Sequence, residues 1–264
     1  MANIFISYAS EDGSEAGSLH RLLTLLGFHC FLAHKDIKKG EQWRAAIVSG
    51  LRTTDIFIPL LSEHGLKSPW VQQECGMAHL LRGKKKKPLI IPVTPNGQIP
   101  PGCLSEYQAL NIGLTFWLSK LNIGHDVASK LGLAIVEQAD CMAAIKPRAI
   151  SNLSGTSIED YSFILGFLSA SGQVTFDDFL SLINHANSNS GAHYSDFVMH
   201  HMYRLLKVHT EELTKLPEWI KAWNRLHERY QKHKEDERRR AEEYARKMQQ
   251  QTEKLLETKG PAAS

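Results

Sequence analysis

Short apolar runs alternate with amphipathic stretches along the first 145 residues, and this alternation limits the possible folds more than any other feature of the chain. Five runs have the length and composition of strands, at 3–8, 28–32, 55–61, 88–93 and 107–112. Four stretches have the apolar spacing of helices, at 14–26, 41–51, 70–81 and 124–144. This alternation predicts an α/β fold with a five-stranded parallel sheet and helices on both faces.

A ligand site is expected at one end of this sheet. In open α/β sheets, ligands bind in the crevice outside the carboxyl ends of the strands. The loops that follow Tyr8, Leu32 and Leu61 are therefore expected to line any site.

The character of the chain changes after residue 145. The segment 146–156 contains Pro147, Ser151, Ser154 and Gly155, which is typical of a linker. Strand signals fade beyond it, and short helices are expected at 158–170, 176–186 and 194–206, with one long helix from Pro217. We therefore expect an α/β domain over 1–145, a linker over 146–156 and an α-helical region over 157–264.

The long helix has two parts of different composition. Its first part carries an apolar stripe that must be buried, either on the preceding helices or on another chain: Leu216, Trp219, Ile220, Trp223, Leu226 and Tyr230. Charges dominate 231–258, where the apolar stripe thins. This stretch fits equally well a solvated helix that frays and a coiled coil that binds a partner.

Composition and missing motifs exclude several classes of protein. A net charge of +3 does not indicate a nucleic-acid-binding protein, and the longest apolar runs are too short to span a membrane. The N-terminus lacks the pattern of a secretory signal, and the four cysteines are widely spaced, so we expect a cytoplasmic protein with free thiols. Without GxGxxG, GxxxxGK[ST] or HExxH, a dinucleotide-binding Rossmann domain, a P-loop NTPase and a metal site are not expected.

Three segments together resemble the successive motifs of a Toll/interleukin-1 receptor (TIR) domain. They are FISYASED at 5–12, FLAHKDIKKGEQW at 31–43 and LLSEHGLKSPWVQQE at 60–74, and Phe116–Trp117 resembles a further Phe-Trp motif of the family. The resemblance covers roughly residues 1–145 and implies a flavodoxin-like TIR domain. The variant looks bacterial and closer to the enzymatic branch, whose members cleave NAD⁺ at the nicotinamide–ribose bond, than to receptor adaptors.

In that branch the catalytic residue is a glutamate four residues after a tryptophan, which implies Glu74 after Trp70. The physical chemistry agrees, because residues four apart share one face of a helix. A carboxylate stabilises the oxocarbenium-like state of glycosidic cleavage, and the cationic nicotinamide leaves as a neutral molecule without a second acid. The structural alternative makes Glu74 a charge at a helix N-terminus and Trp70 a core anchor.

The resemblance also implies residues that contact the substrate. Ser7, Tyr8 and Ala9 match the end of the first strand, where the family faces the nucleotide. Phe31, Lys35, Asp36 and Gly40 match the BB loop and its approach, and Trp70 matches the indole beside the catalytic carboxylate. The chain has Ala33 where many relatives have Asp, which leaves an acidic contact there without a residue to make it. Ser68 is expected to cap the helix that starts at Pro69, and Cys75 to be a buried structural thiol.

The resemblance therefore implies an NAD⁺ glycohydrolase or an ADP-ribosyl cyclase that needs no cofactor, because NAD⁺ is its substrate. It implies a bacterial immune effector or signal generator that self-associates through the TIR domain and the C-terminal helices, with no membrane or specific nucleic-acid partner. The alternative is a non-enzymatic TIR scaffold that recruits other TIR domains, and a virulence factor is a third interpretation.

Overall fold

The computed structural model describes residues 2–32, 43–85, 87–95, 99–112, 124–188 and 195–258. The chain forms two compact units, Met1–Val174 and Thr175–Ser264, and each is considered by itself. In the described residues, no helix combines the length and apolar character that crossing a membrane requires.

Four parallel strands form the main sheet of the first unit. They are β1 (Asn3–Ser7), β2 (His29–Leu32), β3 (Ile56–Pro59) and β4 (Leu89–Ile90), in the order β2-β1-β3-β4. The central strands are apolar on both faces and buried throughout β3, as expected of a parallel sheet covered by helices. Ser7, at the end of β1, pairs with Pro59 of β3.

The predicted five-stranded sheet is interrupted at its fourth strand. The run 88–93 forms β4 and a separate strand β5 (Val93–Thr94), and β5 pairs in parallel with β6 (Leu110–Asn111) in a second, two-stranded sheet. Pro92 lies between β4 and β5 and has no backbone N–H to donate to a ladder. A single parallel bridge between Leu60 and Val93 still joins the two sheets across the break at proline.

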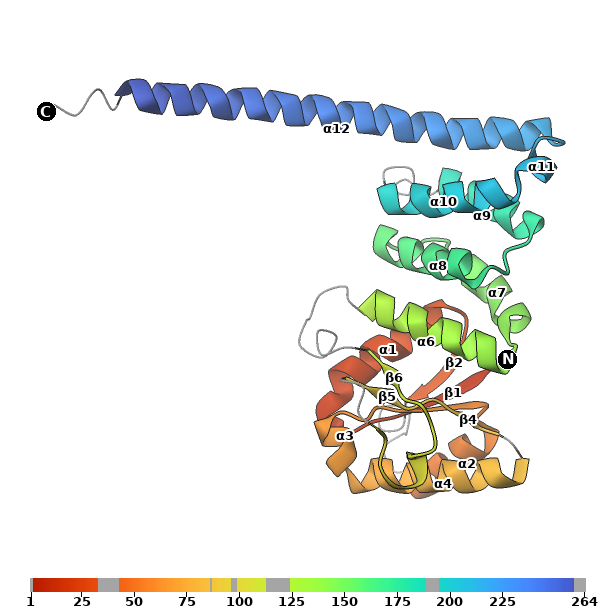
Figure 1. Cartoon of the computed structure of the whole chain (residues 1–264). Coiled ribbons are helices and arrows are strands. Elements are labelled where there is room, and N and C mark those ends of the chain that lie inside the picture. Colours follow the sequence, from red (N-terminus) through yellow and green to blue (C-terminus); the bar gives the residue numbers. More distant parts are fainter. Residues whose placement is uncertain are drawn as a thin grey trace, which may run out of the picture. The chain divides into compact units, whose positions relative to one another are not determined.

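Helices cover both faces of the main sheet (Figure 1). On one side lie α2 (Trp43–Thr53) and α4 (Pro69–Lys85), and on the other lie α1 (Gly13–Leu25) and α6 (Gly124–Ala139). Three short helices that the sequence did not predict follow strand or loop ends: η1 (Ser10–Asp12), α3 (Glu63–Lys67) and η2 (Gly102–Leu104).

The segment expected to be a linker is largely helical. Helix α7 (Met142–Ser151) contains Pro147, and α8 (Ile158–Ser171) follows a short turn, so the compact unit continues to Val174. Burial explains the difference, because α7 places Met142, Ile145 and Ala149 in the core. The backbone of α7 also packs closely against Gly27. A Cβ atom at this position, as in any other residue, would lie only 2.5 Å from the carbonyl oxygen of Ile145. Tertiary packing thus overrides the local linker signals.

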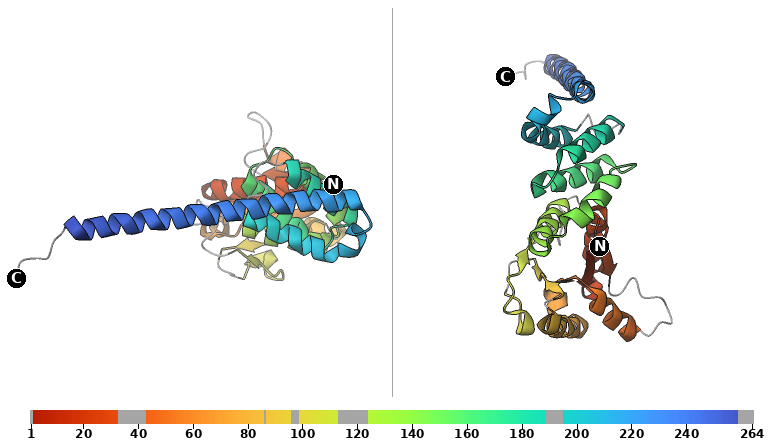
Figure 2. Two further views of the ribbon diagram at one scale, coloured as in Figure 1. Left: turned by 90° about the horizontal axis from the view of Figure 1, so that it is seen from above. Right: turned by 90° about the vertical axis from the view of Figure 1, so that its right-hand side faces the viewer.

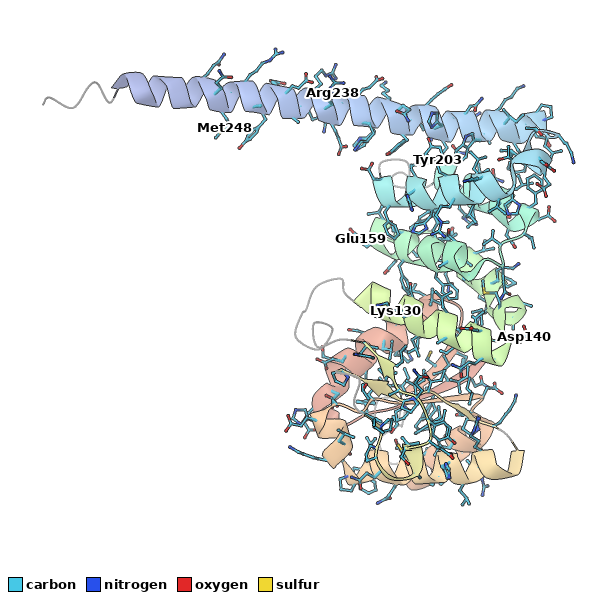
Figure 3. All side chains as sticks on the ribbon, in the orientation of Figure 1. Lys130, Asp140, Glu159, Tyr203, Arg238 and Met248 are labelled. Carbon is cyan, nitrogen blue, oxygen red and sulfur yellow. The ribbon has the colours of Figure 1, made fainter. Side chains whose placement is uncertain are left out.

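The second unit consists of α9 (Phe176–Ser188), α10 (Asp196–Val208), α11 (Thr210–Leu213) and α12 (Pro217–Thr258). The apolar stripe of α12 packs within this unit: Trp223 and Leu226 are buried, and the Trp223 ring lies 5.3 Å from Tyr203 and 6.4 Å from Phe179. Figure 2 shows α12 as one continuous helix. In its charged part, Arg238 and Met248 project outward from the helix (Figure 3).

Candidate active site

The end of β1 provides the first component of the site. Side chains alternate along a strand, so Phe5 and Ser7 point to the same face of the sheet. The Phe5 ring lies against Gly50 of α2, which places both residues on the face that α2 and α4 cover. The chain places β2 on one side of β1 and then crosses over to place β3 on the other side, so the strand order switches between β1 and β3. Open α/β sheets bind ligands outside the carboxyl ends of the strands at such a switch point.

Helix α4 provides the second component. As predicted, it starts at Pro69 after Ser68, whose Oγ accepts a hydrogen bond from the Val71 N–H at 3.4 Å. Val71, Glu74 and Ala78 then recur at the spacing of a helix face and are all buried. Glu74 is the one charged residue on this buried face, which brings its carboxyl group toward β1.

Ser7 and Glu74 meet inside the unit. The Ser7 hydroxyl donates a hydrogen bond of 2.5 Å to Glu74 Oε2, and the two residues are 0% and 2% exposed. The second oxygen, Oε1, has no hydrogen-bond partner among the residues that the structure describes. Burial raises the pKa of Glu74 to about 7, although the hydrogen bond from Ser7 opposes this by favouring the carboxylate.

A second serine–carboxyl pair lies on the loops that follow β1 and β3. The Ser62 hydroxyl donates a hydrogen bond of 2.5 Å to Asp12 Oδ2, and Asp12 is 4% exposed. Burial raises the pKa of Asp12, while the bond from Ser62 lowers it. Ser62 also accepts from the Gly65 N–H at 2.9 Å and so caps α3. The sequence analysis missed this pair, and its one signal was that Ser62 directly follows a predicted strand and Asp12 lies in the loop after another.

The other predicted substrate contacts differ in how deeply they are buried. Tyr8 and Ala9 are 5% and 3% exposed, and the Phe31 ring packs against Phe5 at 5.1 Å between centroids. Trp70 is 40% exposed while Glu74 is buried, so the two do not share one environment despite their helical spacing. Several predicted positions lie outside the described residues: Ala33, Lys35, Asp36, Gly40, Phe116 and Trp117.

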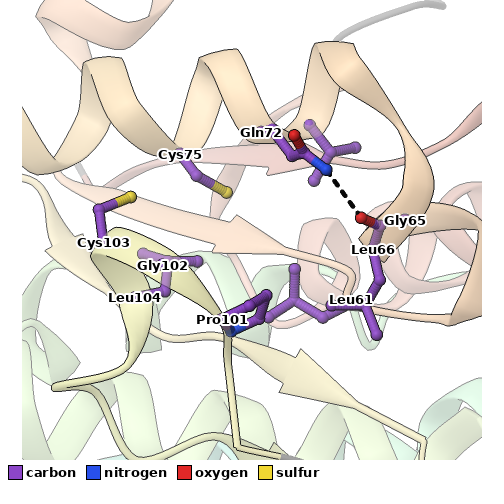
Figure 4. A pocket seen from close by; sticks show the side chains of 10 residues that line it. Leu61, Gly65, Leu66, Gln72, Cys75, Pro101, Gly102, Cys103 and Leu104 are labelled. Carbon is purple, nitrogen blue, oxygen red and sulfur yellow. Dashed lines mark hydrogen bonds between the residues drawn. The ribbon is translucent and has the colours of Figure 1, made fainter.

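A cavity of about 350 Å³ lies between α4, α3 and η2 (Figure 4). Its lining is mostly apolar, with Leu61, Leu66 and Leu104, and its side-chain amide, Gln72, is bonded to the Leu66 carbonyl at 2.9 Å. Cys75 also lines it and is 4% exposed, which confirms the predicted buried thiol. Burial raises the pKa of this thiol. Glu74 does not line the cavity.

The described residues contain no group of three or more His, Cys, Asp or Glu side chains that could hold a metal ion. The chemistry that this geometry supplies is that of a buried carboxyl group. Its pKa lies near neutrality, one of its oxygens is held by a serine, and the other has no partner in the described part of the chain.

Comparison with known proteins identifies the family. Residues 4–117, which contain every strand of both sheets except Asn3 at the start of β1, match the family profile described as TIR domain. No curated protein matches the chain. Among solved structures, the chain is similar to the TIR domains in the structure of the activated Roq1 resistosome directly recognizing the pathogen effector XopQ. The identity is 14% and the TM-score is 0.36, over 64% of this chain and 99% of that chain. Residues 4–117 are therefore a TIR domain.

Proposed function

We propose that this protein cleaves NAD⁺ at the bond between nicotinamide and ribose, with Glu74 as the catalytic residue. The observation that carries the proposal is the buried carboxyl group of Glu74, which lies beside the end of β1, where the strand order switches, with Oε1 unpartnered among the described residues. Strongly shifted pKa values cluster at functional sites, where burial tunes the acidity of a reacting group. It also lies at the position that the enzymatic TIR motif implies.

The proposed chemistry needs one carboxylate. As the glycosidic bond breaks, positive charge moves onto the ribose, and the ionised Glu74 stabilises this charge and accepts hydrogen bonds from the ribose hydroxyls. Nicotinamide departs as a neutral molecule and needs no proton. The acceptor of the ADP-ribosyl group is water in a glycohydrolase and the nucleotide itself in a cyclase.

The site is closed in this structure, because Ser7 and Glu74 have almost no exposed surface. NAD⁺ therefore reaches Glu74 only after the surrounding segments move, and we propose that self-association of the protein drives this opening. We further propose a cytoplasmic bacterial immune role, in which an infection signal opens the site. The three TIR motifs support this part of the proposal.

Substitution of Glu74 by Gln tests the activity. The change keeps the size and the acceptor for Ser7 but removes the charge, so nicotinamide release should fall about 100- to 1,000-fold. Glu63→Gln is the matched control, because Glu63 is an exposed glutamate of α3 paired with Lys67, and its loss should leave the rate unchanged. Chromatographic detection of nicotinamide measures both, with each variant shown by circular dichroism to be folded at the assay temperature. A Glu74→Gln rate above a tenth of the parent rate excludes the assignment.

A non-enzymatic TIR scaffold is the second candidate, and the burial of Glu74 is the observation that favours it. In that case the carboxyl group serves only to join α4 to β1 through Ser7. Parent protein that binds TIR domains but releases no nicotinamide, at any protein concentration that supports self-association, would support the scaffold and contradict the enzyme.

A further inference from the structure

The two oxygens of the Glu74 carboxyl group have different environments. Oε2 accepts the hydrogen bond of Ser7 at 2.5 Å, whereas Oε1 is buried without a partner in the described part of the molecule. The two oxygens of a free, ionised carboxylate are equivalent, so the difference in their environments is imposed by the protein. Ser7 is fixed in turn by the sheet, since its carbonyl accepts from the Leu60 N–H at 2.8 Å.

We propose that Ser7 is the positioning residue of Glu74: its hydroxyl holds Oε2, fixes the plane of the carboxyl group and leaves Oε1 for the ribose of the substrate. This inference rests on the proposed NAD⁺ cleavage. It also reassigns Ser7, which the TIR resemblance implies to be a substrate contact, to a role that acts through Glu74.

No charged group shares this role among the described elements around α4. Helix α4 packs against α2, α3, η2, β3 and β4, and the two strands have no titratable side chain. The titratable side chains described on α2, α3 and η2 all lie exposed: Arg52, Glu63, His64, Lys67 and Cys103.

The titratable groups described in the middle of α4 and on η1 are also occupied or neutral. On α4, Cys75 is neutral because burial raises the pKa of its thiol, His79 contacts Tyr107, and Arg82 bonds the Pro88 carbonyl. On η1, Asp12 is held by Ser62. Burial and the Ser7 hydroxyl are thus the two influences on the pKa of Glu74, and they act in opposite directions.

The hydroxyl therefore has a measurable effect on protonation. A donor to the ionised form favours that form, so loss of the Ser7 hydroxyl should raise the pKa of Glu74 further. A hydrogen bond to a charged group is worth about one to two pH units. The rate of NAD⁺ cleavage depends on ionised Glu74, and its rise with pH should move upward by the same amount.

The test compares Ser7→Thr with Ser7→Val in the full chain. The two side chains have nearly the same volume and both suit a strand, but only Thr keeps the hydroxyl. Ser7→Val should shift the midpoint of the pH–rate profile upward by about one to two units and lower the rate about 10- to 100-fold at pH 6. Ser7→Thr should keep the parent midpoint. Ser62→Ala, which removes the hydroxyl from the other buried pair, should leave this midpoint in place.

A second readout does not depend on activity. The ¹³C chemical shift of the Glu74 side-chain carboxyl group, assigned by its disappearance in Glu74→Gln, reports its pKa directly in each variant. An upward shift in Ser7→Val but not in Ser7→Thr supports the positioning role. Equal values in Val, Thr and parent overturn it. Absence of nicotinamide release from the parent contradicts the proposed function, while this titration still decides whether Ser7 controls Glu74.

Discussion

Glu74 is held in its buried position at a cost to the stability of the TIR unit. Its pKa is about 7 in the folded protein and 4.5 without the fold, so the folded state binds a proton more tightly than the unfolded state. The contribution of Glu74 to the free energy of unfolding is therefore fully present below pH 4.5 and is lost as the pH rises through 7. At about 1.4 kcal/mol per pKa unit, the loss is on the order of 3 kcal/mol.

Glu74→Gln should therefore stabilise the protein in a pH-dependent way. Because Gln does not ionise, the gain in the free energy of unfolding over the parent should be larger at pH 8 than at pH 5 by about 2–3 kcal/mol. Urea unfolding of both proteins at the two pH values measures this difference. Equal gains at pH 5 and pH 8 would show that the fold does not raise the pKa of Glu74.

The sequence predicted which residue to examine at this site but not its surroundings. Glu74 follows from a motif within one helix, where spacing alone places side chains on a face. The bond to Ser7 joins residues 67 positions apart, and its existence depends on the packing of α4 against β1. The exposure of Trp70 depends on the same packing, since residue 70 lies in the first turn of α4, beside the buried face and not on it.

At the scale of elements, α6 joins the TIR sheet to the helices that follow it through a close contact. A Cβ on Gly132 of α6 would lie 2.8 Å from Leu26 Cδ1 and 3.1 Å from Phe167 Cε2, and both of these side chains are fully buried. Gly17 of α1 is also in a helix, but a Cβ there would meet no atom within 4 Å. A substitution at Gly17 therefore reports the effect of helix propensity alone, whereas one at Gly132 reports propensity together with core packing.

Alanine at these two positions should have opposite effects. Gly17→Ala should stabilise the protein by about 0.5–1 kcal/mol, because it gains helix propensity without a clash. Gly132→Ala gains the same propensity but overpacks the core, which costs about 1–3 kcal/mol, so its net effect should be destabilising. Thermal unfolding of both variants provides the measurement. A stabilising Gly132→Ala would mean that α1, α6 and α8 pack less closely than described.

Element types were more predictable than element ends. The predicted strands and helices of the first 112 residues are present because their periodicity is strong. The break at Pro92 was missed, because a run of apolar residues does not show which backbone N–H groups form hydrogen bonds between strands. The helix around Pro147 was missed because turn-forming residues outweighed an apolar face of three residues.

At the scale of the whole molecule, the boundary between compact units lies after Val174 and not near 145. Helix α8 belongs to the first unit, where it packs on α6 and where Arg21 of α1 pairs with Asp160 at 2.9 Å. Its buried side chains include Tyr161, Phe167 and Leu168. A fragment that ends at Pro147 loses this helix and exposes the apolar surface of α6.

A fragment of residues 1–174 should therefore fold as a stable unit with an unchanged Glu74 site, whereas 1–147 should unfold at a lower temperature or aggregate. Circular dichroism during heating and size-exclusion chromatography compare the two fragments. The 1–174 fragment also shows whether the second unit controls assembly, since its oligomeric state and nicotinamide release should then differ from those of the full chain. An equally stable 1–147 fragment would restore the earlier boundary.

Several charged side chains of the charged part of α12 form ion pairs with one another along the same helix. Arg238 pairs with Glu242, Arg239 with Asp236, and Lys247 with Glu243, all three or four residues apart. Such exposed pairs are each worth about 0–1 kcal/mol, and they make a solvated helix possible without a partner. The segment 231–258 was expected to be either a solvated helix or a coiled coil that binds a partner, and these pairs favour the solvated helix. Tyr244 is exposed and could still contact a partner.

The closed position of Glu74 makes opening of the site a proton-release reaction. With a pKa of about 7, roughly half of the chains carry a proton on Glu74 at pH 7. In the proposed opening, contact with water or with the cationic end of NAD⁺ returns the carboxyl group to its ordinary acidity, and the proton leaves. Each such opening should release about half a proton per chain at pH 7, so we expect the heat of NAD⁺ binding measured by calorimetry to depend on the ionisation enthalpy of the buffer.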